Sequence, residues 1–274
     1  MDRNNESENT MRLQVFLAQA GLGSRRACET IIDDLRVSVN GEMISRHGVQ
    51  VSDDDVIKVD GKQVYRTKKS IYLALHKPPG YLCAQSDPEG RPLAVELLQS
   101  RYGMRLYTVG RLDFNSSGLI FVTNDGDFAQ AVSHPSNAVE KEYIVQTRKP
   151  VTDEFLESCV RGLNIEGVQY RFTTWERAGS RSVRVTLLEG KNREIRTVFN
   201  HYRFGVKRVH RVRIGPVKLF RMAPGRFRPL TKQEIQWFMK NSGAVSESDA
   251  PSVSPPAEAK TKRRQVRVRR GKKE

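Results

Sequence analysis

The chain has 274 residues, a formal net charge of +16 and 38% hydrophobic residues. A length of this order predicts about two domains. No apolar run approaches the roughly 20 residues that a transmembrane helix needs, and the polar start "MDRNNESENT" is not typical of a signal peptide. The three cysteines, Cys28, Cys83 and Cys159, show no C-x-x-C spacing. We therefore expect neither a disulfide scaffold nor a structural zinc site, and cysteine usage favours the reducing cytoplasm.

The positive charge is divided between two parts of the chain. Residues 260–274, "KTKRRQVRVRRGKKE", hold nine basic residues and one acidic residue, a net charge of +8. The remainder of the chain carries the other +8, so the body is basic as well as the tail. An excess of Lys and Arg on this scale predicts a polyanionic partner, most often nucleic acid.

The first part of the chain predicts a compact module. Residues 1–10 are expected to be disordered, and residues 11–63 to form two short helices and two hairpins. The hairpins are indicated by Asn40-Gly41 and Asp60-Gly61, each between alternating apolar residues, which are typical of tight type I′ turns.

The second helix of this module has a distinctive start. Ser24 is a natural N-cap, and Arg25 and Arg26 follow it directly. A helix N-terminus already favours phosphate, so this pair predicts a contact with a nucleic-acid backbone. The alternative is an ordinary solvated helix end.

The rest of the chain predicts a larger α+β unit. Residues 64–70 are a polar, basic linker, residues 71–240 alternate between strands and helices, and residues 241–274 are a disordered linker followed by the basic tail. Strands are expected in "IYLALHKPPGYL", where Pro78-Pro79-Gly80 breaks the strand, and in "GLIFVTNDG", "KEYIVQT", "FTTWERA", "SRSVRVTLLEG" and "GVKRVHRVRIGPVKL". Helices are expected in "DFAQAVSHP", which stops near Pro135, and in "TDEFLESCVRGL", "KNREIRTVFNHY" and "LTKQEIQWFMK", the last with Thr231 and Glu234 at capping-box spacing.

The segment "GRLDFNSSGLIFVTNDGD", residues 110–127, carries the main candidate for chemistry. Asp113 lies in a loop that leads into a strongly apolar strand, so a rigid element holds its backbone. Arg193 and Arg196, in "EGKNREIRTVF", could meet this carboxylate and favour its ionised form, which is a usable nucleophile. The alternatives are that Asp113 is a turn former or pairs with Arg111. The sequence contains no metal-ligand cluster, Gly-rich phosphate loop or G-x-S-x-G motif that would predict a competing site.

These motifs together resemble a known family. "GRLDFNSSGLIFVTNDGD", "EKEYIV" and "EGKNREIRTVF", in this order, are similar to the RsuA/RluB/RluE/RluF family of ribosomal RNA pseudouridine synthases, and the upstream "HKPPG" and "DPEGRP" fit the start of its catalytic domain. "LQVFLAQAGLGSRRACETII" and "VSVNG" resemble the S4-type RNA-binding domain that precedes it. The resemblance implies an S4 module at 11–63 and a catalytic domain at 71–240, with a central, largely antiparallel sheet flanked by helices.

The resemblance also implies roles for individual residues. Asp113 is expected to attack the target uridine, Tyr143 to stack on the flipped-out uracil, and Arg196 to pair with Asp113 and orient it. The alternatives on spacing alone are that Tyr143 is a strand aromatic that packs in the core, and that Arg196 is an exposed helical charge paired with Glu189 or Glu194. Contacts with the RNA are expected from Arg25, Arg26, Arg111, Lys191, Arg193, Lys207, Arg208, Arg211 and Arg213.

The chemistry that the resemblance implies needs no redox partner. Pseudouridine formation moves the ribose from N1 to C5 of the same uracil, so we expect neither a cofactor nor a metal. The aspartate could attack C1′ of the ribose or C6 of the base, and the sequence leaves both routes open. The base must leave its stack first, at a cost that stacking and hydrogen bonds in a pocket offset.

The resemblance leaves the substrate and two turns open. "SHPSNAVEKEY" and the basic tail look most like RluB-type members, which modify large-subunit rRNA; the alternatives are small-subunit rRNA or a non-catalytic RNA-binding role in ribosome assembly. We expect a cytoplasmic monomer that binds rRNA, with no membrane partner. Leu35 and Arg203 stand where the family usually has glycine, which predicts an altered turn or backbone strain at both positions.

Overall fold

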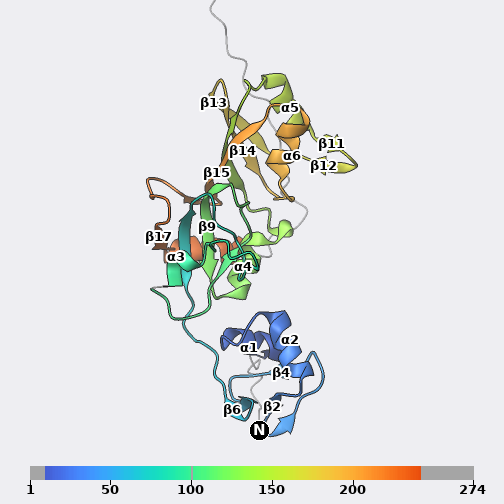
Figure 1. The fold of residues 1–274 in the computed structure, drawn as a ribbon, viewed down its shortest axis with the longest axis vertical. Helices are drawn as coiled ribbons and strands as arrows, with labels where there is room; N and C mark the ends of the chain where they lie inside the picture. Colours follow the sequence, from blue (N-terminus) through green and yellow to red (C-terminus); the bar gives the residue numbers. More distant parts are fainter. Residues whose placement is uncertain (1–9, 100, 242–274) are drawn as a thin grey trace, which may run out of the picture. The chain divides into compact units, whose positions relative to one another are not determined.

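The computed structural model describes residues 10–99 and 101–241 (Figure 1). The predictions of a disordered start, a disordered linker after residue 241 and a basic tail fall almost entirely outside these residues. No helix among the described residues is long and apolar enough to cross a membrane.

The N-terminal module has two helices beside a small antiparallel sheet. Its strands are β1 (Met11–Arg12), β2 (Val37–Val39), β3 (Glu42–Met43), β4 (Gln50–Val51), β5 (Ile57–Val59) and β6 (Lys62–Gln63), and its helices are α1 (Leu13–Gln19) and α2 (Arg25–Asp33). Four strands form a sheet in the order β3-β2-β5-β6, and β1 pairs with β4. Leu17, Cys28 and Ile57 are among the side chains that fill one apolar core here.

Local sequence signals are confirmed in this module. The Ser24 hydroxyl accepts a hydrogen bond from the Ala27 amide at 3.0 Å and caps α2. Asn40 and Asp60 have positive φ angles at the predicted hairpin turns. Leu35 also has a positive φ, 57°, so the chain keeps the left-handed helix end that glycine would favour. The outcome is strain rather than a different turn, at a cost of about 1–2 kcal/mol.

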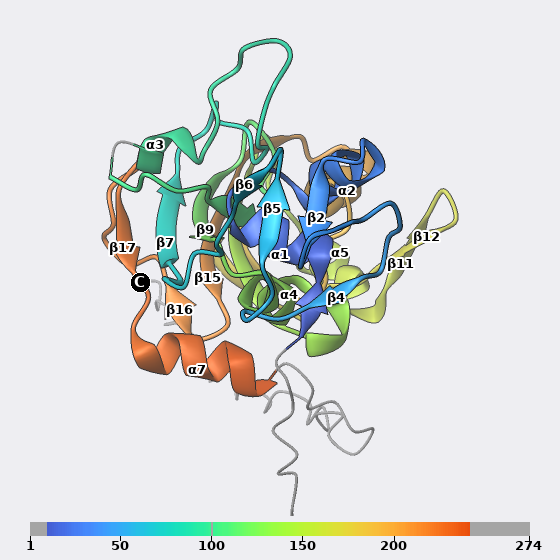
Figure 2. The same cartoon turned by 90° about the horizontal axis from the view of Figure 1, so that it is seen from below.

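The larger unit is built on one nine-stranded sheet. Its strands are β7 (Tyr72–Lys77), β8 (Tyr107–Val109), β9 (Ser117–Thr123), β10 (Lys141–Thr147), β13 (Thr174–Gly179), β14 (Ser182–Leu187), β15 (Val206–Ile214), β16 (Val217–Lys218) and β17 (Phe227–Pro229). The main path runs β13-β14-β10-β15-β9-β7-β17, and β8 and β16 pair with β9 and β15. Figure 2 shows β7, β9 and β15 side by side, with α7 at the lower edge of the view. The predicted mixed fold with a largely antiparallel sheet is confirmed.

Helices cover both faces of this sheet. They are α3 (Glu96–Gln99), α4 (Gly126–Ser133), α5 (Asp153–Arg161), α6 (Glu194–His201) and α7 (Lys232–Asn241), with a 3₁₀ turn at Pro135–Asn137 and a small hairpin of β11 (Leu163–Ile165) and β12 (Val168–Tyr170). Ile120 packs into the core that includes α5 and α6, and Phe121 into the core that includes α4 and α7. Strand β9 is buried on both faces, which explains its uninterrupted apolar sequence.

Several short elements had no sequence prediction, namely β1, β4, β8, β11, β12, β17 and α3. Each has only two to four residues, too few to show a period of its own. Where the signal is local the prediction holds, as at α7: the Thr231 amide donates to Glu234 at 2.8 Å, and the Glu234 amide donates to the Thr231 hydroxyl at 3.2 Å.

One parallel strand pair organises the centre of the sheet. In β9 and β15, His210 is in register with Ser117 and Arg211 with Gly118, whereas the neighbouring pairs β10–β15 and β7–β9 are antiparallel. A Cβ atom at Gly118 would lie 2.2 Å from the Arg211 carbonyl oxygen, so this crossing requires glycine. Because Tyr143 of β10 is in register with Arg211, three strands bring Gly118, Arg211 and Tyr143 into one row.

Candidate active site

Asp113 lies in the loop that enters β9 at its start. Ser116 closes a turn by donating its amide hydrogen to the Asp113 carbonyl at 2.9 Å. Leu112, before it, is buried with 7% of its surface exposed, and the Asp113 side chain keeps 29% exposure. The backbone is therefore anchored on both sides while the carboxylate stays accessible.

A buried lysine anchors the loop that carries Asp113. Lys77, the last residue of β7, is fully buried. Its Nζ donates to the carbonyl oxygens of Ser116 at 2.7 Å and Pro78 at 2.9 Å, and lies 3.3 Å from that of Asp113. Burial lowers the Lys77 pKa to about 8. The ammonium group thus ties the end of β7 to the loop that carries Asp113.

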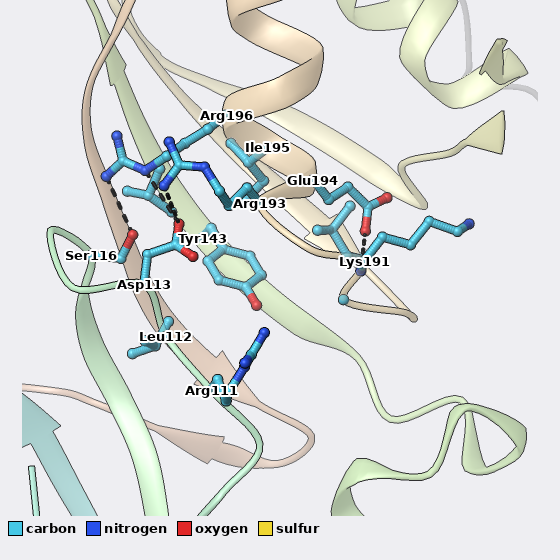
Figure 3. A pocket seen from close by; sticks show the side chains of 13 residues that line it. Arg111, Leu112, Asp113, Ser116, Tyr143, Lys191, Arg193, Glu194, Ile195 and Arg196 are labelled. Atoms are coloured by element: carbon cyan, nitrogen blue, oxygen red, sulfur yellow. Dashed lines mark hydrogen bonds and ion pairs between the residues drawn. The ribbon is translucent and has the colours of Figure 1, made fainter. Parts of the chain in front are cut away.

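Two arginines from the start of α6 face the carboxylate. Arg196 Nε lies 3.4 Å from Asp113 Oδ2, and Arg193 Nη1 lies 3.9 Å from the same oxygen (Figure 3). Arg196 is 11% exposed and also donates to the Ser116 hydroxyl at 3.3 Å. The resemblance implies this pairing of Arg196 with Asp113. The alternative, an exposed Arg196 paired with Glu189 or Glu194, does not match its position in the structure.

Tyr143 completes a cavity of about 80 Å³ around the carboxylate. It comes from β10, is 7% exposed, and its ring lies beside Asp113 in Figure 3. Arg111, Lys191, Arg193 and Arg196 also line this cavity. The structure thus brings together the predicted catalytic set and three of the predicted RNA contacts.

The loop before α6 is fixed by a buried carboxyl group. Glu194 is 4% exposed, and its Oε2 accepts a hydrogen bond from the Lys191 amide at 2.9 Å. Burial raises the Glu194 pKa. Arg193 takes a left-handed conformation with φ of 52° at the N-cap, which turns the chain into α6 at the cavity.

The geometry matches what comparison with known proteins finds. The family described as RNA pseudouridylate synthase matches residues 71–201, and the S4 domain family matches residues 11–57. A protein of Borreliella burgdorferi named as an uncharacterized RNA pseudouridine synthase is 41% identical over 228 residues, covering 81% of this chain and 91% of its own length. The chain belongs to the RNA pseudouridine synthase family.

Other relatives and a solved structure agree. A ribosomal large subunit pseudouridine synthase B of Vibrio cholerae is 36% identical, covering 93% of this chain and 83% of the relative. A protein of the same name from Xylella fastidiosa is 39% identical, and the chain spans 50% of its length. A crystal structure of a pseudouridylate synthase superposes with a TM-score of 0.62 at 27% identity, covering 83% of this chain and 99% of that one. This protein is thus a pseudouridine synthase, an isomerase, with an S4 RNA-binding domain.

The remaining predicted RNA contacts of this synthase lie elsewhere. Arg25 and Arg26 are exposed at the start of α2, and Lys207 and Arg208 are exposed on β15. None of these four residues lines the Asp113 cavity.

Two predicted contacts have a different environment from the one expected. Arg213 is engaged by two carboxylates, Glu140 at 2.9 Å and Glu142 at 3.2 Å. Arg211 lies inside the domain, 4% exposed, and its Nη1 is 3.4 Å from the Tyr143 hydroxyl. Successive side chains of β15 point to opposite faces of the sheet, and these two arginines point toward the domain interior. The basic sequence of β15 therefore does not give a uniformly basic surface.

The sequence motifs do not predict the positions that Lys77, Glu194 and Gly118 take around the site. Lys77 had one available signal, a lysine directly before Pro78-Pro79-Gly80 at the end of an otherwise apolar strand. Among the described residues, no group of three or more His, Cys, Asp or Glu side chains could hold a metal ion.

Proposed function

We propose that this pseudouridine synthase isomerises a uridine of large-subunit ribosomal RNA with Asp113 as the nucleophile. The observation that carries the proposal is the Asp113 carboxylate paired with Arg196 at 3.4 Å in a cavity shared with Tyr143. The choice of large-subunit RNA rests on the Vibrio cholerae and Xylella fastidiosa relatives, whose names specify that subunit.

In the proposed reaction the uridine leaves its stack and enters the cavity. Extrusion costs a few kcal/mol, and stacking of the uracil on Tyr143 offsets part of this cost. Arg111, exposed at the cavity, faces the RNA and fills the space that the base leaves. Lys191 and Arg193 hold the phosphates that flank the target, since phosphate contacts position the RNA without reading its sequence.

Asp113 then attacks as a carboxylate. The C1′–N1 bond breaks, the uracil turns, C1′ joins C5, and the bond that Asp113 formed with the substrate breaks to release the carboxylate; C5 loses its hydrogen as a proton and N1 gains one. Arg196 orients the carboxylate, because its Nε lies 3.4 Å from Asp113 Oδ2 and its guanidinium also donates to Ser116. Attack at C1′ and attack at C6 both use this arrangement. The S4 domain adds further contacts with the RNA. An enzyme that acts on rRNA is expected in the cytoplasm.

The deciding experiment is the Asp113→Asn variant, which keeps the shape of the side chain and removes its negative charge. We expect pseudouridine formation in rRNA to be abolished and RNA affinity to be retained. Asp127→Asn, an exposed aspartate outside the cavity, is the matched control and should behave as wild type. Continued conversion by Asp113→Asn would refute the mechanism.

The substrate is tested by mapping pseudouridines in rRNA from cells that lack this protein. A site that disappears from large-subunit rRNA supports the proposal. Loss of a small-subunit site would replace it, and an unchanged map would favour a non-catalytic role.

A further inference from the structure

A second cavity of about 170 Å³ lies next to the Asp113 cavity, and the two share Arg111, Tyr143 and Gly190 in their linings. Lys141 and Arg211 also line it. A cavity that holds a water needs only about 10–15 Å³ of such volume, so this one has room for a much larger group.

Three cations line this cavity: Arg111 is exposed, whereas Lys141 is half-buried and Arg211 is buried, and these last two have no carboxylate among the described residues to balance them. Arg211 is 4% exposed; its Nε donates to the Leu119 carbonyl at 2.6 Å, but its Nη2 is buried and has no hydrogen-bond partner. Lys141 Nζ donates to the carbonyls of Val139 at 2.9 Å and Leu188 at 3.2 Å. Within residues 10–99 and 101–241, neither cation has a carboxylate within ion-pair distance.

The acidic residue at this cavity, Glu189, does not balance the charges of Lys141 and Arg211. Glu189 lines the same cavity, but its carboxylate pairs with Lys191 at 3.0 Å and is 54% exposed. Burial, followed by the nearby Arg211 charge, lowers the Lys141 pKa to about 8. Two neighbouring positive groups in a poorly hydrated site are costly unless an anion joins them.

We propose that Lys141 and Arg211 form a phosphate-binding site that takes the RNA phosphodiester next to the target uridine. The proposal rests on the proposed function, because the shared lining places this phosphate beside the base held at Tyr143. A phosphodiester supplies the negative charge and the acceptor oxygens that Arg211 Nη2 and Lys141 lack. Docking of the phosphate would also brace Tyr143, whose hydroxyl and ring both contact Arg211.

The first test uses inorganic phosphate and requires neither RNA nor activity. Thermal unfolding of the full chain is followed in potassium phosphate against potassium chloride at equal ionic strength. Phosphate also stabilises proteins non-specifically, so the readout is the difference between variants. We expect Lys141→Met to raise the phosphate concentration for half-maximal stabilisation by about tenfold or more, since one charge-assisted contact is lost.

Two further variants keep this test decisive. Lys149→Met removes an exposed lysine that does not line the cavity, and should respond as wild type. Glu189→Gln removes the one acid at the cavity and should tighten phosphate binding about two- to threefold, whether or not Lys141→Met folds. Equal phosphate responses in all the folded variants would overturn the site.

The second test identifies the source of the phosphate. Once the modified uridine is mapped, RNA hairpins with a neutral methylphosphonate on either side of it are titrated against both proteins. We expect wild type to bind the RNA with one of the two methylphosphonates about tenfold more weakly than unmodified RNA. Lys141→Met should bind that modified RNA and unmodified RNA equally well. Inorganic phosphate binding without any methylphosphonate effect would overturn the RNA assignment. Phosphate binding in a protein that never forms pseudouridine would reject the proposed function and leave the anion site standing.

Discussion

Replacing Lys77 with methionine removes a buried ammonium group and keeps most of the side-chain volume. Two short hydrogen bonds are lost, to Ser116 at 2.7 Å and Pro78 at 2.9 Å. Bonds of this charged kind contribute about 1.5–3 kcal/mol each. Removing the buried charge offsets about 3 kcal/mol of this loss. That is the free energy equivalent to the fall of the Lys77 pKa from 10.5 to about 8. We predict a net loss of about 2 kcal/mol in the free energy of unfolding, or roughly 4–8 °C in melting temperature for a domain of this size.

The same substitution should reduce catalysis more than stability. Lys77 Nζ also lies 3.3 Å from the Asp113 carbonyl, so its loss frees the loop that carries the nucleophile. A displacement of about 1 Å costs about a hundredfold in rate, and we expect kcat to fall by this factor with KM little changed. Release of the C5 hydrogen as tritium from labelled rRNA measures the rate, and Lys149→Met is the control.

The pH dependence of the stability difference provides a separate check. Folded Lys77 releases its proton near pH 8, whereas the unfolded chain keeps it to about 10.5. The unfolded state binds more protons in this window, so this group's contribution to stability rises with pH. The gap between wild type and Lys77→Met should widen by up to about 3 kcal/mol from pH 8 to 10.5, measured by urea unfolding. Lys141 titrates in both proteins and cancels. A constant gap together with an unchanged kcat would refute the role of Lys77.

The remaining predictions concern one histidine, one arginine and the tail. Burial, followed by the charge of Arg208, lowers the His210 pKa to about 4. The unfolded state therefore takes up a proton first as the pH falls from 6.5, and we expect stability to drop by roughly 3 kcal/mol by pH 4. Urea unfolding of His210→Asn should lack this part of the drop, and an equal drop would contradict the assignment. Arg196→Lys keeps the charge but loses the planar fork, so kcat should fall about 10–100-fold at unchanged melting temperature, and full activity would show that charge alone suffices. Deleting residues 260–274 should weaken RNA binding and flatten its salt dependence; identical salt titrations of the two proteins would reject a role for the tail.

What the sequence by itself determined was mostly local. Caps and turns such as Ser24, Asn40-Gly41 and Thr231 involve residues within a few positions of each other, so composition and spacing are sufficient to predict them. The order of the motifs around Asp113, Tyr143 and Arg196 was enough for the family and hence for the sheet. Leu35 shows the limit of such signals: its side chain is exposed, yet the Arg36 amide donates to the Ile31 carbonyl at 3.3 Å and keeps a left-handed helix end that leucine itself disfavours.

The tertiary structure decided what those motifs touch. Parallel pairing of β9 with β15 aligns Gly118, Arg211 and Tyr143, and no local period encodes a partner so distant in the chain. Lys77 is one of many basic residues in the sequence, but in the structure it is buried and its hydrogen bonds anchor the Asp113 loop. Arg211 was expected to contact RNA at the surface, but it is buried and lines a second cavity. Alternation along a strand fixes only that successive side chains face opposite ways. The packing of the domain decides which of the two faces is buried.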